Sequence, residues 1–218
     1  MIKISRKDMA YEYLYDEIIN NRKKPGEYLV ESDIANILSI SRTPVREALR
    51  DLEKDGLVSN FNGRSSMVSY ISPTDISDIF DIRISLESLA LEKSIYRITS
   101  QEIDDLIEKF EYLGDNFKWE DSHKADKQLH ELIIKKSGNK KLFYILNNLN
   151  SQIERFRRIA SRASNRSFKS IKEHLDLLYC LKSQNLDESR QSLIYHLNSV
   201  KESLLEISII DSTENVYI

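Results

Sequence analysis

The segment from Ser41 to Leu52 constrains the fold of this chain more than any other stretch. It reads SRTPVREALRDL and predicts one helix, with Ser41 as its N-cap and Pro44 in the first turn. Its apolar residues recur at the spacing of a single buried face: Val45, Ala48, Leu49 and Leu52. We therefore expect a short helix that packs one side against a core.

Three arginines follow another side of this predicted helix. Arg42, Arg46 and Arg50 are spaced four apart, so their side chains form one stripe. Guanidinium groups on a short helix suit the major groove of DNA. The alternative is a solvated surface helix whose arginines pair with acidic residues of the same stretch, namely Glu47, Asp51 and Glu53.

The composition favours a mostly α-helical chain with no strong basic field. The 218 residues include only five glycines and three prolines, and the net charge is −3. Residues 1–72 hold 11 basic and 11 acidic side chains, so any DNA contact must come from local placement of charge. Cys180 is alone, and no apolar run approaches the roughly 20 residues that span a bilayer. We expect a cytoplasmic protein with no membrane contact.

Two predicted helices precede the Ser41 helix. Residues 7–22 have an amphipathic pattern that Lys24-Pro25-Gly26 ends. The next helix has Ile34, Ala35 and Leu38 on its inner side, and a tight turn at Ser39-Ile40 follows it. Two short helices joined by a tight turn predict a helix-turn-helix, in which the second helix reads bases.

A β-hairpin is predicted after the Ser41 helix. Two short β-prone pieces, Leu57–Phe61 and Met67–Ile71, flank Asn62-Gly63, and Asn-Gly is the strongest short hairpin signal. Arg64 beside the tip is a candidate minor-groove or phosphate contact, or an ordinary solvated arginine. Helices followed by a hairpin predict a winged helix-turn-helix.

These motifs together resemble the DNA-binding head of GntR-type bacterial transcriptional regulators. The resemblance rests on Leu29-x-Glu31-x-x-Ile34-Ala35, Ser41–Leu49, Leu52 and Gly56-Leu57-Val58. It implies a homodimer that binds double-stranded DNA at an inverted-repeat operator and responds to a small molecule. It also implies recognition-helix contacts at Ser41, Arg42, Thr43 and Arg46 and a wing contact at Gly63.

Two positions depart from that family pattern. Ser32 stands where many members carry a DNA-contacting arginine, so one contact is missing or its base preference is altered. Ser39 replaces the usual turn glycine, which makes the backbone turn less easy without preventing it.

The remainder of the chain predicts an all-helical antiparallel bundle. Pro73 ends the second strand and separates residues 1–72, the winged helix-turn-helix, from residues 73–218. About six helices are expected over residues 74–97, 100–117, 119–137, 139–163, 166–184 and 186–209.

A metal site is predicted inside this bundle. Asp126 and His130 are one helical turn apart, and His174 and His196 each border an apolar stripe on a separate helix. One carboxylate and three imidazoles suit a borderline divalent cation. The alternative is that each histidine is an ordinary hydrogen-bonded core residue, and His123 competes for the face of Asp126.

The same residues resemble the FCD ligand-binding domain that accompanies GntR heads of the FadR subfamily. The resemblance implies metal ligands at Asp126, His130, His174 and His196, leaves His123 over, and implies small carboxylic acids as effectors. Zn²⁺ is the expected ion, with Ni²⁺ and Mn²⁺ as alternatives. Six helices rather than seven resemble the VanR-type branch. Arg83 is the expected clamp for the effector carboxylate, and its alternative partner is Glu87.

The sequence therefore predicts a DNA-binding regulator whose 73–218 domain binds the effector and metal and dimerises. The same sequence allows two other interpretations. The bundle could serve only dimerisation, with no metal or ligand switch. A helical metallohydrolase is disfavoured because no HExxH signature is present and no further carboxylate is placed as a general base.

Overall fold

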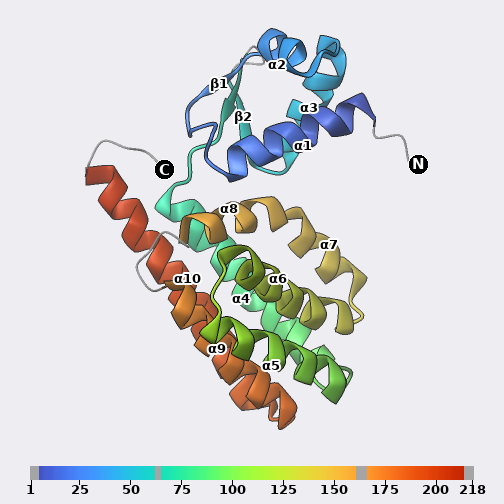
Figure 1. The fold of residues 1–218 in the computed structure, drawn as a ribbon, viewed down its shortest axis with the longest axis vertical. Helices are drawn as coiled ribbons and strands as arrows, with labels where there is room; N and C mark the ends of the chain where they lie inside the picture. The colour runs from blue at the N-terminus through green and yellow to red at the C-terminus, as the bar shows by residue number, and fades with distance from the viewer. Residues whose placement is uncertain (1–4, 62–64, 161–165, 214–218) are drawn as a thin grey trace. The chain divides into compact units, whose positions relative to one another are not determined.

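The computed structural model describes residues 5–61, 65–160 and 166–213. The chain divides into two compact units. The first consists of Met1–Ser72, Asn148–Arg158 and Ser208–Ile218, and the second consists of Pro73–Asn147 and Ile159–Ile207. Helices dominate, as predicted (Figure 1). No helix within the described ranges is long and apolar enough to cross a membrane.

Three helices build the N-terminal part of the first unit. They are α1 (Arg6–Ile19), α2 (Glu31–Leu38) and α3 (Arg42–Lys54). The predicted face of α3 is buried against α1 and the sheet, which confirms the helical periodicity of that segment. Ser39 joins α2 to α3 in the left-handed conformation, with φ of 55°, so the turn forms without glycine.

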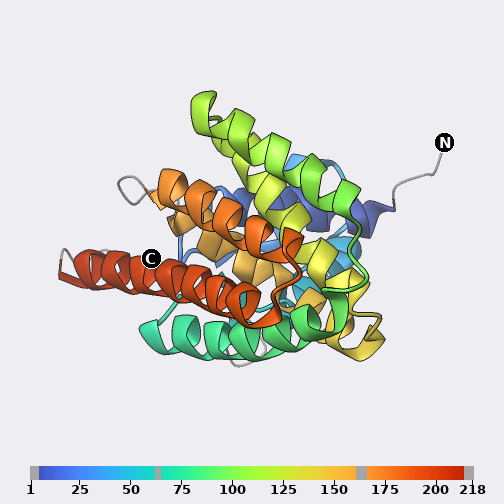
Figure 2. The ribbon, with the colours of Figure 1, turned by 90° about the horizontal axis from the view of Figure 1, so that it is seen from below.

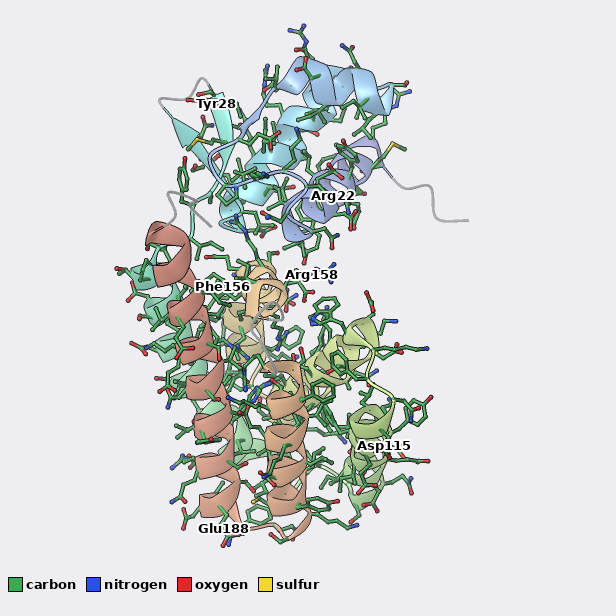
Figure 3. All side chains as sticks on the ribbon, turned by 60° about the vertical axis from the view of Figure 1, so that its left-hand side comes forward. Arg22, Tyr28, Asp115, Phe156, Arg158 and Glu188 are labelled. Carbon is green, nitrogen blue, oxygen red and sulfur yellow. The ribbon has the colours of Figure 1, made fainter. Side chains whose placement is uncertain are left out.

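A three-stranded antiparallel sheet completes this part. Strands β2 (Val58–Phe61) and β3 (Ser65–Val68) form the predicted hairpin, whose tip at residues 62–64 lies outside the described residues. The second strand was predicted over Met67–Ile71 but begins and ends earlier, at Ser65 and Val68. Its pairing with β2 ends where Val68 faces Val58, and the N–H of Ser69 donates one further bond to the carbonyl of Leu57. The sequence did not predict β1 (Tyr28–Leu29), which pairs with the other edge of β3. Tyr28 projects from this edge strand and is 62% exposed (Figure 3).

Seven helices follow in the C-terminal part that the structure describes. They are α4 (Pro73–Ser94), α5 (Ser100–Asp115), α6 (Trp119–Lys136), α7 (Lys140–Asn148), α8 (Asn150–Ala160), α9 (Arg166–Lys182) and α10 (Leu186–Thr213). The prediction of a single helix over 139–163 was wrong, because the structure has a break at Leu149 between α7 and α8. Asparagines surround that break, and asparagine competes with the helical backbone for hydrogen bonds. The described residues after Ser72 therefore form seven helices, where about six were expected, the number that resembles the VanR-type branch.

Long helices of the second unit pack side by side around an apolar core. Helices α4, α10, α9 and α5 follow one another across the bundle (Figure 2). Exposed ion pairs join α4 to α10, from Arg190 to Glu92 at 2.9 Å and from Lys201 to Asp81 at 2.7 Å. Helix α6 packs against both α4 and α5. The interior of this bundle is where the predicted metal-binding side chains lie.

Candidate metal centre and nucleic-acid interface

The structure brings the four predicted metal ligands together. Asp126 and His130 lie on the inner side of α6, His174 lies on α9, and His196 lies on α10. One ligand atom from each residue lies within 4.8 Å of the others, and the three histidines are at most 3% exposed. Helical periodicity places each side chain, and the packing of three helices makes them converge.

The separations between these atoms fit a shared cation. Nε2 of His174 lies 3.2 Å from Nε2 of His196 and 3.1 Å from Oδ1 of Asp126. Oδ1 of Asp126 lies 3.6 Å from Nε2 of His130 and 4.0 Å from Nε2 of His196. Ligands about 2.1 Å from one ion stand roughly 3 to 3.4 Å apart when they are adjacent. The two separations that involve His174 match that spacing, and the two longer ones require the side chains to move closer by about half an ångström.

Glu87 holds the far side of His130. Its Oε2 lies 2.6 Å from Nδ1 of His130, and its Oε1 accepts a hydrogen bond of 2.8 Å from Nε of Arg83. Glu87 and Arg83 are each 2% exposed, and the Arg83 guanidinium also lies 5.1 Å from the Phe80 ring centroid. A carboxylate on Nδ1 fixes the ring so that Nε2 points into the cluster.

Glu173 plays the same part for His196. Its Oε2 lies 2.8 Å from Nδ1 of His196, and both of its oxygens accept hydrogen bonds from Arg166, at 2.8 and 2.7 Å. The hydroxyl of Ser199 donates a further bond of 2.9 Å to Glu173. Two imidazoles of the cluster are thus each held by a buried glutamate, and each glutamate is held by a buried arginine.

One buried nitrogen supports the fit of a cation. Nε2 of His130 is buried and has no hydrogen-bond partner among the described residues. A buried polar atom without a hydrogen bond is costly, and a ring nitrogen that faces a carboxylate and two other imidazoles can ligate a cation once it is deprotonated. Three imidazoles and one carboxylate are the donor set that a borderline cation such as Zn²⁺ accepts.

The electrostatic environment favours the neutral, metal-binding form of two of the three histidines. Burial lowers the pKa of His174, and burial together with the nearby His174 lowers the pKa of His196 to about 3. Although burial opposes it, the Glu87 carboxylate raises the pKa of His130. Burial also opposes ionisation of Glu173, but its bonds to His196 and Arg166 lower its pKa to about 2. Two of the imidazoles are therefore neutral near pH 7, as metal ligands must be.

Two other predicted residues are placed differently. His123 stacks on Trp119 with ring centroids 4.9 Å apart and is not part of the cluster. Arg83 donates to Glu87, the alternative partner that the sequence left open, and its role toward an effector remains a prediction.

Sequence reasoning missed the supporting shell of Glu87, Glu173 and Arg166. Glu173 neighbours His174 in the chain but contacts His196, so adjacency was misleading. The available signal was the spacing of Arg166 and Glu173, which are seven apart and lie on one helical face.

The α3 arginines lie on an exposed face, as predicted. Arg42, Arg46 and Arg50 line a cleft of about 600 Å³ together with residues of α2 and the sheet. Ser41 and Thr43 are exposed at the start of α3. Ser41 occupies the predicted N-cap position but its side chain makes no capping hydrogen bond. The predicted contacts at Gly63 and Arg64 lie outside the described residues.

Arg46 pairs with an acidic residue that lies outside its own helix. Its Nε and Nη2 donate to the two carboxylate oxygens of Glu31, each at 2.7 Å. The predicted alternative was a pairing with Glu47, Asp51 or Glu53, and Asp51 instead contacts Lys7 and Lys54. Ser32, at the position that departs from the GntR pattern, donates its hydroxyl to Asp33.

Comparison with known proteins identifies both parts of the chain. Residues 6–68 match the model of bacterial regulatory proteins of the gntR family, and residues 78–199 match that of the FCD domain. The HTH-type transcriptional regulator YdhC of Bacillus subtilis (strain 168) is 29% identical over 201 residues, which are 90% of each chain. The gluconate operon transcriptional repressor of the same organism is 26% identical and covers 91% of this chain and 84% of its own length.

A solved structure supports the fold as a whole. E. coli McbR/YncC superposes with a TM-score of 0.74 at 22% identity, over 94% of this chain and 99% of that chain. At this identity the likeness concerns the fold. The family matches indicate a transcriptional regulator and not an enzyme.

Proposed function

Because the chain belongs to the GntR family of bacterial regulatory proteins and carries an FCD domain, we propose that this transcriptional regulator is switched by a small carboxylic acid bound at a metal centre. Residues 1–72 form the operator-binding domain in this proposal, and residues 73–218 form the effector, metal and dimerisation domain. The observation that carries the proposal is the convergence of Asp126, His130, His174 and His196 inside the bundle.

These four residues would hold a divalent cation, with Zn²⁺ favoured over Ni²⁺ and Mn²⁺ by the three imidazoles. When bound, the cation supplies a Lewis-acid site that accepts a carboxylate oxygen. Glu87 and Glu173 orient two of the imidazoles, and Arg83 and Arg166 keep those glutamates in place. The alternative, in which the bundle only dimerises, leaves Nε2 of His130 with no hydrogen bond and with the Asp126 carboxylate 3.6 Å away.

The charges around the cluster support an anionic effector. Three carboxylates (Asp126, Glu87 and Glu173) and two guanidinium groups (Arg83 and Arg166) make a net charge of −1 when the histidines are neutral. A divalent cation would change that net charge to +1. An interior charge is costly unless it is paired, so a monoanion would complete the site. The gluconate operon repressor carries the name of such an acid, which supports sugar acids as the first class to test.

Arg83 is the proposed clamp for the effector carboxylate. A guanidinium fork binds a carboxylate through two parallel hydrogen bonds, and Arg83 already contacts Glu87, which supports His130. An acid that contacts both Arg83 on α4 and the cation held by α6 would therefore change how α4 packs against α6.

The DNA-binding residues proposed are Ser41, Arg42, Thr43 and Arg46 of the α3 segment, with Gly63 and Arg64 of the wing. The exposed stripe of arginines on α3 supports this assignment. We propose a homodimer on an inverted repeat, because a symmetric operator fixes the spacing of two heads. Effector binding would change the separation or mobility of those heads, and this alters affinity without changing any base contact.

The experiment combines metal analysis with DNA binding. Purified protein is analysed for bound metal, and its affinity for the DNA upstream of its own operon is measured by gel shift with and without sugar acids, hydroxy acids and fatty acyl compounds. We expect one metal ion per chain and an affinity change with one class of acid. The double variant His174→Ala, His196→Ala loses both, and His123→Ala, a histidine outside the cluster, retains both. A wild-type protein that binds no metal, and whose affinity for DNA is the same with and without every acid, refutes the switch.

A further inference from the structure

The Glu31–Arg46 ion pair lies at the surface that the proposed function assigns to DNA. Glu31 is the first residue of α2, and Arg46 lies in the second turn of α3. Both carboxylate oxygens accept from one edge of the guanidinium group, which is formed by Nε and Nη2. Such a two-point contact fixes the plane of the guanidinium group as well as its position.

Both ends of this ion pair are attached to fixed backbone. Glu31 follows β1, whose Leu29 is 4% exposed, and the next turn of α2 buries Ile34 and Ala35. Arg46 follows directly after Val45, which has no exposed surface. The pair therefore connects two anchored helices across the cleft, although the Arg46 side chain itself is 57% exposed.

The contact leaves the other edge of Arg46 available. A guanidinium group carries five N–H donors, and the Glu31 contact uses one on Nε and one on Nη2. The remaining edge, formed by Nη1 and Nη2, is the one that can donate in parallel to O6 and N7 of guanine. Hydrogen bonding to Arg46, together with the charges of Arg42 and Arg50, lowers the pKa of Glu31, so it is ionised near pH 7.

We propose that Glu31 is a positioning residue that holds Arg46 to read one guanine in each half-site. The inference rests on the proposed contact between Arg46 and DNA. A flexible arginine binds phosphates and bases alike, whereas a fixed guanidinium edge can meet only a correctly placed pair of acceptors. Glu31 also offsets one positive charge, which reduces the sequence-independent attraction to the phosphate backbone. Both effects favour discrimination between bases over overall affinity for DNA.

The test is selection from a random double-stranded DNA library, followed by affinity measurements on the selected site. Four proteins are compared: wild type, Glu31→Gln, Arg46→Ala and the matched control Asp33→Asn. Asp33 lies in the same first turn of α2 and accepts from Ser32, so its substitution removes the same charge without touching Arg46. Thermal unfolding followed by circular dichroism checks that each variant is folded, and Glu31→Ala is a second variant at that position.

The wild type is expected to require guanine at one position of each half-site, and Arg46→Ala is expected to lose that requirement. A bidentate arginine discriminates by roughly 5- to 150-fold, and Glu31→Gln is expected to lower that preference at least threefold while binding to random DNA stays equal or tightens. Asp33→Asn keeps the wild-type preference.

Two results overturn the inference in distinguishable ways. If Glu31→Gln tightens binding to every sequence equally and keeps the guanine preference, Glu31 merely competes with DNA for Arg46. If Arg46→Ala also keeps the preference, the proposed base contact of Arg46 is itself wrong.

Discussion

Glu173 lies beside His174 in the chain, yet its carboxylate contacts Nδ1 of His196, 2.8 Å away on the neighbouring helix. The same carboxylate accepts hydrogen bonds from both terminal nitrogens of Arg166. The relationship means that the orientation of one proposed metal ligand depends on residues from a different helix. Substitutions in this supporting shell should therefore change metal affinity without removing any ligand.

Glu173→Gln should weaken metal binding by about 10- to 100-fold, because removal of an outer-shell carboxylate from a ligating histidine has effects of that size. The measurement is a competitive titration of the metal against a chelating dye. Glu202→Gln on the exposed face of α10 is the control and should bind metal as the wild type does. Equal affinity in the Glu173 variant would mean that His196 does not depend on this hydrogen bond.

The Glu173 variant should also lose stability in the absence of metal. Its Arg166 partner is 3% exposed, and a buried charge that loses its partner destabilises by roughly 3 to 5 kcal/mol. Denaturant unfolding of the metal-free proteins measures this loss. An unchanged unfolding midpoint would show that solvent reaches Arg166 after substitution.

Arg83→Lys should separate effector binding from metal binding. Lysine keeps a positive charge beside Glu87 but lacks the guanidinium fork. We expect the affinity for the acid to fall about tenfold or more, as for one charge-assisted hydrogen bond of roughly 1.5 to 3 kcal/mol, while metal affinity changes little. Calorimetry measures both affinities. A parallel fall in the two affinities would instead mean that Arg83 acts only through Glu87.

Metal removal should lower the thermal stability of the chain. A ligand that binds only the folded state at 100 times its dissociation constant stabilises by about 2.7 kcal/mol. We expect chelation to lower the melting temperature and added Zn²⁺ to restore it. The His174→Ala, His196→Ala variant should melt at the same temperature with and without chelator. A response to chelation in that variant would place the stabilising ion elsewhere.

Glu102 should give a stability contribution that depends on pH. Its hydrogen bonds to Lys136 and to the backbone of Thr99 lower its pKa from 4.5 to about 2 in the folded state. Because the folded-state pKa is lowered, the ionised Glu102 stabilises the folded chain fully above about pH 4.5. This stabilisation is lost as the pH falls towards 2. The difference in unfolding free energy between wild type and Glu102→Gln should therefore shrink from pH 7 to pH 3. Glu108→Gln, exposed on the same helix, provides the control, and a difference that is constant with pH would contradict the assignment.

Features set by local periodicity could be predicted from the sequence. The buried face of α3 and the shared face of Asp126 and His130 follow from helical spacing, and the hairpin follows from Asn62-Gly63. The break at Leu149 was missed because apolar spacing continues through the asparagines that interrupt the helix.

Features set by contacts between distant segments could not be predicted in the same way. Strand β1 has two residues and exists because β3 offers it a free edge. The contacts of Glu31 with Arg46 and of Glu87 with His130 span 15 and 43 residues, and they depend on how helices pack. A motif can show that such residues are present, but it does not show which of them touch.

The measurement that tests the metal centre most directly is anomalous X-ray diffraction from crystals of the metal-loaded protein. A metal centre of this kind predicts one element-specific peak per chain, enclosed by Asp126, His130, His174 and His196. A peak at any other place, or full metal loading of crystals with these four side chains turned away from one another, would contradict it.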